Sequence, residues 1–263
     1  MSADSHSWPG FLGLSVLEEI DSTNAEALRR AAAGLDGPHW FLARRQSGGR
    51  GRQGRRWHSM PGNLLATLLL TVRAPVCLLP QLSLVAALAA FDMVADALRK
   101  AGNQVEPLLK WPNDLLLEGR KCAGILLETA SSGASAPHVA LGFGVNLARA
   151  PEEEAVKATS LRHYGVELEP EAALGRLARA MLARLEQWDE GRGFGGTRQS
   201  WLRHAHKKGQ ELRVRQPGAP LSGTFETLDE DGALILRTGP DRTCRILAGD
   251  IWLTESTRSN RTR

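Results

Sequence analysis

The sequence predicts an α+β protein with a central mixed or antiparallel sheet, a few flanking helices and a small C-terminal β-barrel. Short apolar runs between turn signals, typical of buried strands, recur from residue 63 to residue 146. Three segments combine apolar residues at helical spacing with signals for a helix end. After Gly209 the pattern changes to short alternating segments, which indicates a second, all-β unit.

The first helix is predicted to begin at Thr23. Thr23 and Glu26 have the spacing of a capping box, in which each side chain binds the backbone amide of the other residue. Gly34 is placed to end this helix, because glycine readily adopts the left-handed conformation that terminates many helices.

Two longer helices are predicted further along the chain. Pro80 suits the first turn of one helix, since a missing N–H costs nothing there, and Gly102 is placed to end it. The other begins near Pro170, and the glycine-rich residues 191–196 break it. Apolar residues form one stripe on each helix, which predicts packing on a core: Leu84, Leu88, Phe91, Ala95 and Leu98, then Leu174, Leu177, Ala178, Met181, Leu182, Leu185 and Trp188.

Strands are predicted wherever apolar runs lie between turn signals. In the larger unit they are residues 63–72, 105–109, 115–117, 123–128 and 139–146, with a glycine- and serine-rich turn at 131–137. In the smaller unit they are 211–215, 221–227, 233–237, 243–247 and 251–254, with a hairpin at Asp231-Gly232. About 45 residues give a barrel only a marginal core, so the small unit is expected to lean on the larger one.

These patterns divide the chain into a larger unit at 1–208, a small barrel at 209–255 and a tail at 256–263 that is expected to be disordered. With 263 residues, 42% of them hydrophobic, the chain can bury a sizeable core. Its net charge of +4 permits a nucleic-acid partner without requiring one. Three cysteines, odd in number and far apart, fit a reducing cytosol, and neither a leader nor a membrane span is indicated.

The most informative segment for function is a loop at 46–57 with the sequence QSGGRGRQGRRW. It contains four arginines, and two more precede it, yet residues 37–91 contain no Asp or Glu. A guanidinium fork suits phosphate, and glycines allow a ligand to approach the backbone closely. The loop therefore indicates an anion site; the alternative is a solvated basic loop.

Residues 49–54 also match the dinucleotide-binding pattern G-x-G-x-x-G. That pattern requires a helix that opens on the last glycine and an acidic residue about 20 positions later. Here a turn-like segment follows the loop, and the next acid is Asp92. A dinucleotide site is therefore rejected.

Three further segments carry functional groups. Lys110-Trp111-Pro112-Asn113-Asp114 places a cation, an aromatic ring, an amide and a carboxylate before a strand; the alternative is a structural turn capped by Asp114. Lys121 follows a hairpin turn, where an isolated lysine is usually solvated. Residues 142–147, GFGVNL, are too bare and too polar for packing alone.

In combination these segments resemble the biotin protein ligases. The resemblance rests on Ser22-Thr23-Asn24, on Gln46 with Gly49-Arg50-Gly51-Arg52, Gly54, Arg55 and Trp57, on residues 110–114, on Lys121 with Gly124-Ile125-Leu126, on residues 142–147 and on residues 158–161. It implies the class II synthetase-like fold of biotin and lipoate ligases with an SH3-like C-terminal barrel. Only 21 residues precede Ser22, too few for the helix-turn-helix domain of some members, so a ligase without repressor activity is expected.

The resemblance also implies roles for individual residues. Biotin would be bound by Ser22, Thr23, Asn24, Gln46, Arg50, Gly51, Arg52, Lys121 and Gly124. ATP would be bound by Arg50, Arg52, Arg55, Trp57, Lys110, Asn113, Asp114 and Asn146, together with Mg²⁺ through ligands that the sequence does not identify. Arg52 and Lys121 would stabilise the reacting oxygens as biotinyl-AMP forms, and Asp114 would assist the attack of the acceptor lysine.

The implied partner is a biotin carboxyl carrier protein or the biotin-accepting domain of a carboxylase, in the cytoplasm and without a specific nucleic acid or a membrane. Two copies could pair through an edge strand, but no residue decides between monomer and homodimer. The alternatives are a lipoate or octanoate ligase of the same fold, a non-catalytic nucleic-acid-binding protein that uses the arginine loop, and a carrier or interaction protein.

Overall fold

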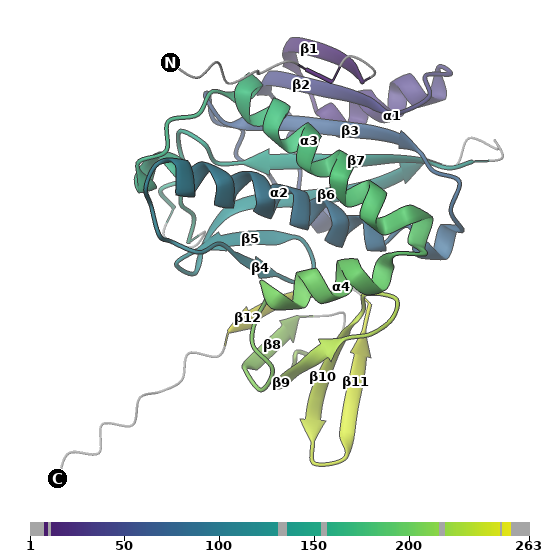
Figure 1. Cartoon of the computed structure of the whole chain (residues 1–263), viewed down its shortest axis with the longest axis vertical. Helices are drawn as coiled ribbons and strands as arrows, with labels where there is room; N and C mark the ends of the chain where they lie inside the picture. Colours follow the sequence, from purple (N-terminus) through teal and green to yellow (C-terminus); the bar gives the residue numbers. More distant parts are fainter. Residues whose placement is uncertain are drawn as a thin grey trace.

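The structure is a computed structural model that describes residues 8–9, 12–130, 136–153, 157–215, 219–247 and 249–253. The expected turn at 131–137 and the expected disordered tail at 256–263 fall largely or wholly outside the described residues. Figure 1 shows a sheet layered with helices and, beneath it, a smaller β unit near the C-terminus.

The larger unit is built on one seven-stranded sheet with the order β1-β2-β3-β7-β6-β5-β4. Its strands are β1 (Gly13–Ile20), β2 (His39–Gln46), β3 (Leu64–Thr71), β4 (Leu108–Lys110), β5 (Asp114–Leu117), β6 (Arg120–Ala130) and β7 (His138–Val145). β1 and β2 are parallel, and the other neighbours are antiparallel. The predicted mixed sheet is confirmed.

Helices cover both faces of this sheet. α2 (Gln81–Lys100) and α3 (Pro170–Trp188) lie on one face, and the shorter α1 (Thr23–Ala32) lies on the other (Figure 1). The apolar stripes predicted for α2 and α3 are largely buried in the main core. α1 buries Ala27 and Ala31 against Phe41, Leu69 and Ala140 of the sheet. Because α1 is short, it covers only part of this face of the sheet, and the uncovered part is open to a ligand.

Some local predictions need correction. α1 begins at Thr23 as expected, but its N-cap is Ser22, whose hydroxyl accepts from the amide of Ala25. The proposed capping box of Thr23 and Glu26 is therefore wrong by one residue, and Glu26 instead pairs with Arg29 and Arg30 of its own helix.

Three elements were not predicted from the sequence. They are β1, β2 and α4 (Phe194–Arg203), the last of which starts inside the glycine-rich segment that was read as a simple break. Short 3₁₀ turns occupy Arg52–Gly54, Val76–Leu78, Leu161–Tyr164 and Asp189–Gly191. No α-helix opens after Gly54, which agrees with the rejection of a dinucleotide site.

α2 is long and apolar enough to be considered as a membrane span. However, 78% of its apolar window is buried inside the protein, between the sheet and α3. Burial of this kind is what a core helix of a globular unit shows.

The smaller unit is a five-stranded antiparallel sheet with the order β11-β10-β9-β8-β12, consistent with the expected SH3-like domain. Its strands are β8 (Glu211–Arg215), β9 (Leu221–Leu228), β10 (Leu234–Gly239), β11 (Arg242–Ile246) and β12 (Asp250–Leu253). Its apolar residues continue the main core without a gap, as its small size requires. Arg198 of α4 ties the units together by donating to the carbonyl of Leu228 and the hydroxyl of Thr227.

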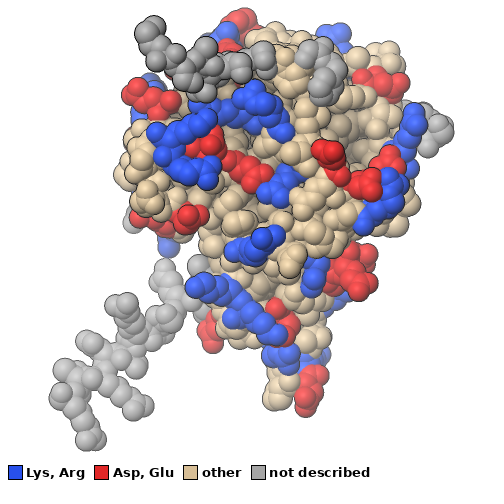
Figure 2. All heavy atoms as spheres, in the orientation of Figure 1, with Lys and Arg blue, Asp and Glu red and all other residues tan. Residues whose placement is uncertain are grey.

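Charged side chains of both signs are interspersed over the face that carries α2 and α3 (Figure 2). Several form ion pairs between these helices, such as Arg184 with Asp92 at 2.7 Å. This face therefore does not carry the continuous basic stripe of a nucleic-acid-binding surface.

Candidate active site

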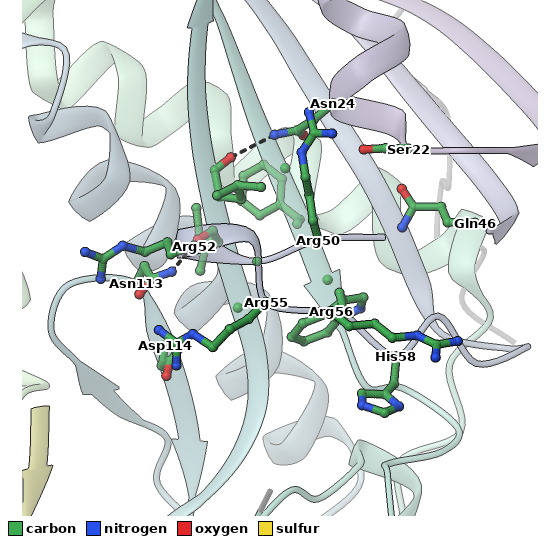
Figure 3. A pocket seen from close by; sticks show the side chains of 18 of the residues that line it. Ser22, Asn24, Gln46, Arg50, Arg52, Arg55, Arg56, His58, Asn113 and Asp114 are labelled. Carbon is green, nitrogen blue, oxygen red and sulfur yellow. Dashed lines mark hydrogen bonds between the residues drawn. The ribbon is translucent and has the colours of Figure 1, made fainter. Parts of the chain in front are cut away.

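A cavity of about 400 Å³ lies beside the N-terminus of α1, beneath the arginine loop. Its walls come from the end of β2, the loop that follows, the start of β6 and the end of β7 (Figure 3). The lining consists of Ser22, Thr23, Asn24, Gln46, Arg50, Gly51, Arg52, Arg55, Arg56, Trp57, His58, Ala66, Asn113, Asp114, Lys121, Gly124, Ile125, Leu126, Gly142, Phe143, Gly144, Asn146, Pro151 and Ala158.

One end of the cavity is a network of uncharged polar groups. Gln46 Oε1 accepts from the amide of Thr23 at 2.8 Å and from its hydroxyl at 3.0 Å, which fixes the orientation of the Gln46 amide. Gln46 Nε2 donates to Ser59 Oγ at 3.2 Å. An amide nitrogen carries two hydrogens, so one Gln46 N–H remains for a ligand. Ser22 presents its hydroxyl at the same end (Figure 3).

Asn24 occupies the same end and is held from three sides. Its Oδ1 lies 2.6 Å from the hydroxyl of Thr67, and its Nδ2 donates to Leu126 O and Glu128 Oε2. A Cβ at Gly142 would lie 2.3 Å from Asn24 Oδ1, so only glycine leaves room for this arrangement. The side chain of Asn24 is thus a fixed acceptor at the floor of the cavity.

The indole of Trp57 lies over a bare patch of the sheet. A Cβ at Gly144 would come within 2.4 Å of its ring, and one at Gly124 would come within 3.1 Å. Both glycines therefore make room for the indole. Gly124 of β6 and Gly144 of β7 are directly paired in the sheet, so together they form one bare surface beneath the ring. Trp57 Nε1 is buried without a hydrogen-bond partner in the described structure. Such an aromatic surface suits a planar ring of a ligand.

A cation and a carboxylate meet where β5 and β6 begin. Lys121 Nζ lies 2.6 Å from Asp114 Oδ1 and 5.4 Å from the centre of the Trp57 ring. Lys110 reaches the other oxygen of Asp114 at 3.8 Å but does not line the cavity, so its assignment to ATP stays a prediction. Trp111 is buried and donates to the carbonyl of Gly232 in the small unit.

Asn113 and Asn146 serve the backbone as well as the cavity. Asn113 Nδ2 donates to Ile125 O at 2.5 Å, and Asn146 Nδ2 donates to Thr159 O at 3.1 Å. The amide of Thr159 in turn donates to Lys121 O. The segment 158–161 thereby supports both Lys121 and Asn146, which gives this part of the sequence motif a physical role.

The arginines of the loop diverge. Arg50 points toward Asn24 and binds Glu128, with Nε 3.2 Å from Oε1, whereas Arg55 extends toward Asp114 (Figure 3). Arg52 lies beside Asn113 and donates to the carbonyl of Gly249 in the small unit at 3.0 Å. The missing local counter-charge is thus partly supplied from distant parts of the chain.

Arg44 and Arg45, just ahead of the loop, lie outside the cavity. Arg44 pairs with Glu18 and Glu171, and Arg45 pairs with Glu19. These two arginines therefore connect β2 to β1 and α3 and do not contribute to the anion site.

The structure brings together every predicted site residue except Lys110. It adds residues that were not assigned from the sequence: Arg56, His58, Ala66, Ile125, Leu126, Gly142, Phe143, Gly144, Pro151 and Ala158. Gly142, Phe143 and Gly144 belong to a motif that had already been singled out, so their place could have been inferred. Ala66 and Pro151 carry no sequence signal that distinguishes them from packing residues.

Two pKa values near the cavity are shifted. Hydrogen bonds from Arg29 lower the pKa of Asp21, which precedes Ser22, to about 2, against the opposing effect of burial. Burial raises the pKa of the Cys122 thiol to about 12. Cys122 is therefore a packing residue beside Asn146 and not a nucleophile.

Acidic side chains are scarce in the lining. Among the described residues, no group of three or more His, Cys, Asp or Glu side chains could hold a metal ion. Mg²⁺ commonly binds through one or two carboxylates together with phosphates of a substrate. The residues present fit only an ion of that kind, and Asp114 is the carboxylate of the described lining.

Comparisons with known proteins agree with this geometry. Residues 16–146 match the biotin/lipoate A/B protein ligase family, and residues 208–253 match the biotin protein ligase C-terminal domain. The biotin–[acetyl-CoA-carboxylase] ligase of Paracoccus denitrificans is 43% identical over 86% of this chain and 94% of its own length. The same enzyme of Mycobacterium tuberculosis is 37% identical over 92% of this chain and 89% of its own length.

Comparisons with solved structures indicate the same family. The biotin protein ligase of Aquifex aeolicus, in complex with biotin and ATP, superposes with a TM-score of 0.76 at 26% identity over 92% of this chain and 98% of that one. The Leishmania major ligase with biotinyl-5-AMP gives 0.61 at 26% identity, over 90% and 99%. On these similarities and on the site that it carries, the chain belongs to the biotin protein ligases of the biotin/lipoate A/B protein ligase family.

Proposed function

We propose that this chain attaches biotin to a lysine of a biotin-accepting carboxylase domain at the expense of ATP, and that the cavity beneath the arginine loop is its active site. The observation that carries the proposal is the arrangement within this cavity. An uncharged network of donors and acceptors forms one end, the indole of Trp57 lies on its glycine surface, and Lys121 stands beside them.

The uncharged end suits the ureido head of biotin, which has one carbonyl and two N–H groups. The spare N–H of Gln46 matches the ureido carbonyl, and Asn24 Oδ1 matches a ureido N–H. The head of lipoate has no such groups and would leave the spare Gln46 N–H without a partner. This difference favours biotin over the lipoate alternative.

Formation of biotinyl-AMP requires the carboxylate of biotin to approach the α-phosphorus of ATP. Two anions repel each other at about 3 Å, and cations that are held at the reacting oxygens remove this repulsion. Lys121 is such a cation, because Asp114 and the 158–161 segment fix its position. We assign Arg50, Gly51 and Arg52 to the biotin tail and phosphate, and Arg55, Trp57, Asn113 and Asn146 to the nucleotide.

Pyrophosphate leaves in the first step. In the second step the amine of an acceptor lysine attacks the carbonyl carbon of the mixed anhydride, which forms the amide and releases AMP. An amine with a pKa near 10.4 is almost entirely protonated at neutral pH, so a carboxylate that accepts its proton helps. We assign this role to Asp114, whose carboxylate lines the cavity beside Lys121. We also propose that Mg²⁺ accompanies the phosphates of ATP.

Further proposals concern organisation. We assign catalysis to residues 1–208 and a supporting role to 209–255, through Trp111 and Arg52. β5 pairs with β6 only between Arg120 and Gly124, and Asn113 bonds Ile125. Residues 126–130 of β6 therefore offer an edge through which two copies could form a homodimer. We propose a cytoplasmic enzyme that binds no specific nucleic acid; on the face that carries α2 and α3, charges of both signs are interspersed (Figure 2).

A direct test uses the full-length protein with biotin, ATP, Mg²⁺ and a purified biotin-accepting carboxylase domain. Mass spectrometry should find one biotin on a single lysine of that domain, only when ATP is present. Replacement of biotin by lipoate or octanoate should give no product. Modification by lipoate at a comparable rate would favour the alternative activity, and no modification by any acid would contradict the proposal.

A further inference from the structure

Glu128, near the end of β6, joins two parts of the site without lining the cavity itself. Its Oε2 accepts from Asn24 Nδ2 at 2.8 Å, and its Oε1 accepts from Arg50 Nε at 3.2 Å. One oxygen therefore binds the floor of the cavity, and the other binds the loop above it. The Glu128 side chain is only 27% exposed, so its charge is partly shielded from solvent.

The contact with Asn24 strengthens one of the two orientations of that amide. Both hydrogens of Nδ2 are used, one by Glu128 and one by the carbonyl of Leu126, and Oδ1 lies against the hydroxyl of Thr67. A hydroxyl can donate or accept, so Thr67 alone does not fix the amide. The carboxylate of Glu128 and the carbonyl of Leu126 can only accept, so both require Nδ2 on their side, and the bond to Glu128 is the charge-assisted one. Glu128 therefore adds the charge-assisted contact that, together with the carbonyl of Leu126, keeps Asn24 Oδ1 on the side of Thr67.

The contact with Arg50 has a different consequence. Arg50 belongs to the glycine-rich loop, and its side chain lies over the end of the cavity that Asn24 occupies (Figure 3). Its ion pair with Glu128 joins the loop to β6 at this end. A ligand head that is bound beside Asn24 would then lie beneath this ion pair, and the ion pair would have to break before the ligand leaves.

We propose that Glu128 is a positioning residue for the head of biotin, which orients the Asn24 amide as an acceptor and holds Arg50 over the bound ligand. This inference rests on the proposed placement of the biotin head at Asn24. Glu128 touches neither substrate in this account, so it affects binding and selectivity and leaves the chemical step unchanged.

The test compares Glu128→Gln with Glu19→Gln in the full-length protein. Glu19 pairs with Arg45 on the surface at 2.6 Å, so its variant loses an equivalent ion pair away from the site. For Glu128→Gln, calorimetry should show biotin binding weaker by about tenfold, as expected for one charge-assisted hydrogen bond. Adenylation at saturating biotin should stay within about threefold of wild type, because no transition-state contact is lost.

Selectivity provides a readout that a merely structural role would not change. Wild type should strongly prefer biotin to an analogue that is methylated on its ureido nitrogens, because Asn24 offers only an acceptor. In Glu128→Gln only the carbonyl of Leu126 still requires Nδ2 at its present position, so the Asn24 amide is held less firmly and this preference should fall by about tenfold. The Glu19→Gln variant should keep both the affinity and the preference of wild type.

A second variant keeps the inference falsifiable should Glu128→Gln fold poorly. Arg50→Gln breaks the bridge from the loop side and should speed the release of biotinyl-AMP, while Asn24 still discriminates against the methylated analogue. Equal biotin affinity and selectivity in Glu128→Gln and Glu19→Gln would overturn the inference, as would an unchanged release rate in Arg50→Gln. If wild type itself neither binds nor adenylates biotin, the proposed function falls, and this inference falls with it.

Discussion

Lys121 Nζ lies 2.6 Å from Asp114 Oδ1, on a strand that begins directly after the turn at 118–119. The carboxylate of the neighbouring strand β5 thereby holds the lysine at the start of β6. Lys121 is not part of the hydrophobic core. This relationship distinguishes Lys121 from the solvated turn lysine that its sequence position alone indicates.

Replacement of Lys121 by Ala should preserve the fold and abolish most adenylation. A cation at the reacting oxygens contributes on the order of 3–4 kcal/mol in the transition state, which corresponds to a loss of roughly 100-fold or more. Lys100→Ala is the matched control, because Lys100 pairs with Asp96 on the exposed end of α2. Pyrophosphate exchange and thermal unfolding of both variants measure the effect. A rate within about threefold of wild type for Lys121→Ala would exclude this role.

Replacement of Arg52 by Gly should uncouple the two steps. The variant loses a guanidinium and gains roughly 0.5–1 kcal/mol of backbone freedom in the loop, so the loop closes less often. It also loses the bond from Arg52 to Gly249 O that joins the loop to the small unit. ATP should be consumed while less carrier is biotinylated, and released biotinyl-AMP should label lysines of a bystander protein.

Mass spectrometry of the bystander detects this release. Arg52→Lys is the control, because it keeps the charge without adding backbone freedom, and it should label the bystander less than Arg52→Gly does. If Arg52→Gly labels the bystander only as much as wild type does, while it biotinylates the carrier less, the loop binds phosphate but does not retain the intermediate.

Gly144→Ala should impair nucleotide binding through Trp57. The added methyl would lie 2.4 Å from the indole, which must then leave its place on the sheet. Gly175→Ala in α3 is the matched control, because its nearest neighbour is 3.9 Å away and alanine favours helix by roughly 0.5–1 kcal/mol. ATP titrations should therefore show weaker binding for Gly144→Ala alone. Equal ATP affinity in the two variants would mean that Trp57 does not form part of the nucleotide site.

Asp21 should make the stability of the protein depend on acid pH. Its folded-state pKa is lowered to about 2 from a usual 3.8, so its contribution is complete above pH 3.8 and disappears as the pH falls through 2. The Arg29–Asp21 pair is half exposed, which limits the effect to below about 1 kcal/mol. Urea unfolding of wild type and Asp21→Asn between pH 2 and 5 should show a difference that shrinks at the acid end. A difference that grows toward pH 2 would have the wrong sign.

The sequence predicted those elements that carry their own end signals. α2 and α3 were located by Pro80, Gly102 and Pro170, and the hairpin at 231–232 was located by its turn residues. β2 was missed because Arg44 and Arg45 make its second half look like a loop. Their partners Glu18 and Glu19 lie on β1, so the charges balance only when the two strands are side by side.

The site residues that lie in sequence motifs could be predicted, whereas the contacts between segments that are distant in the sequence could not. Ser22, Gln46, Trp57 and Lys121 were identified in advance, and they share one cavity. The bond from Arg52 to the small unit joins positions almost two hundred residues apart, and no local pattern encodes it. Glu128 looked like an ordinary strand residue, because its partners Asn24 and Arg50 come from two other segments.

The most direct test of the central claim is the exchange of labelled pyrophosphate into ATP by the purified full-length protein. An enzyme that reversibly forms an acyl-adenylate catalyses this exchange without an acceptor, so the result of the assay does not depend on the identity of the acceptor. We expect rapid exchange with biotin and Mg²⁺ present, none without biotin, and a near-complete loss in Lys121→Ala. Exchange that is independent of biotin, or absent with every acid supplied, would contradict the central claim.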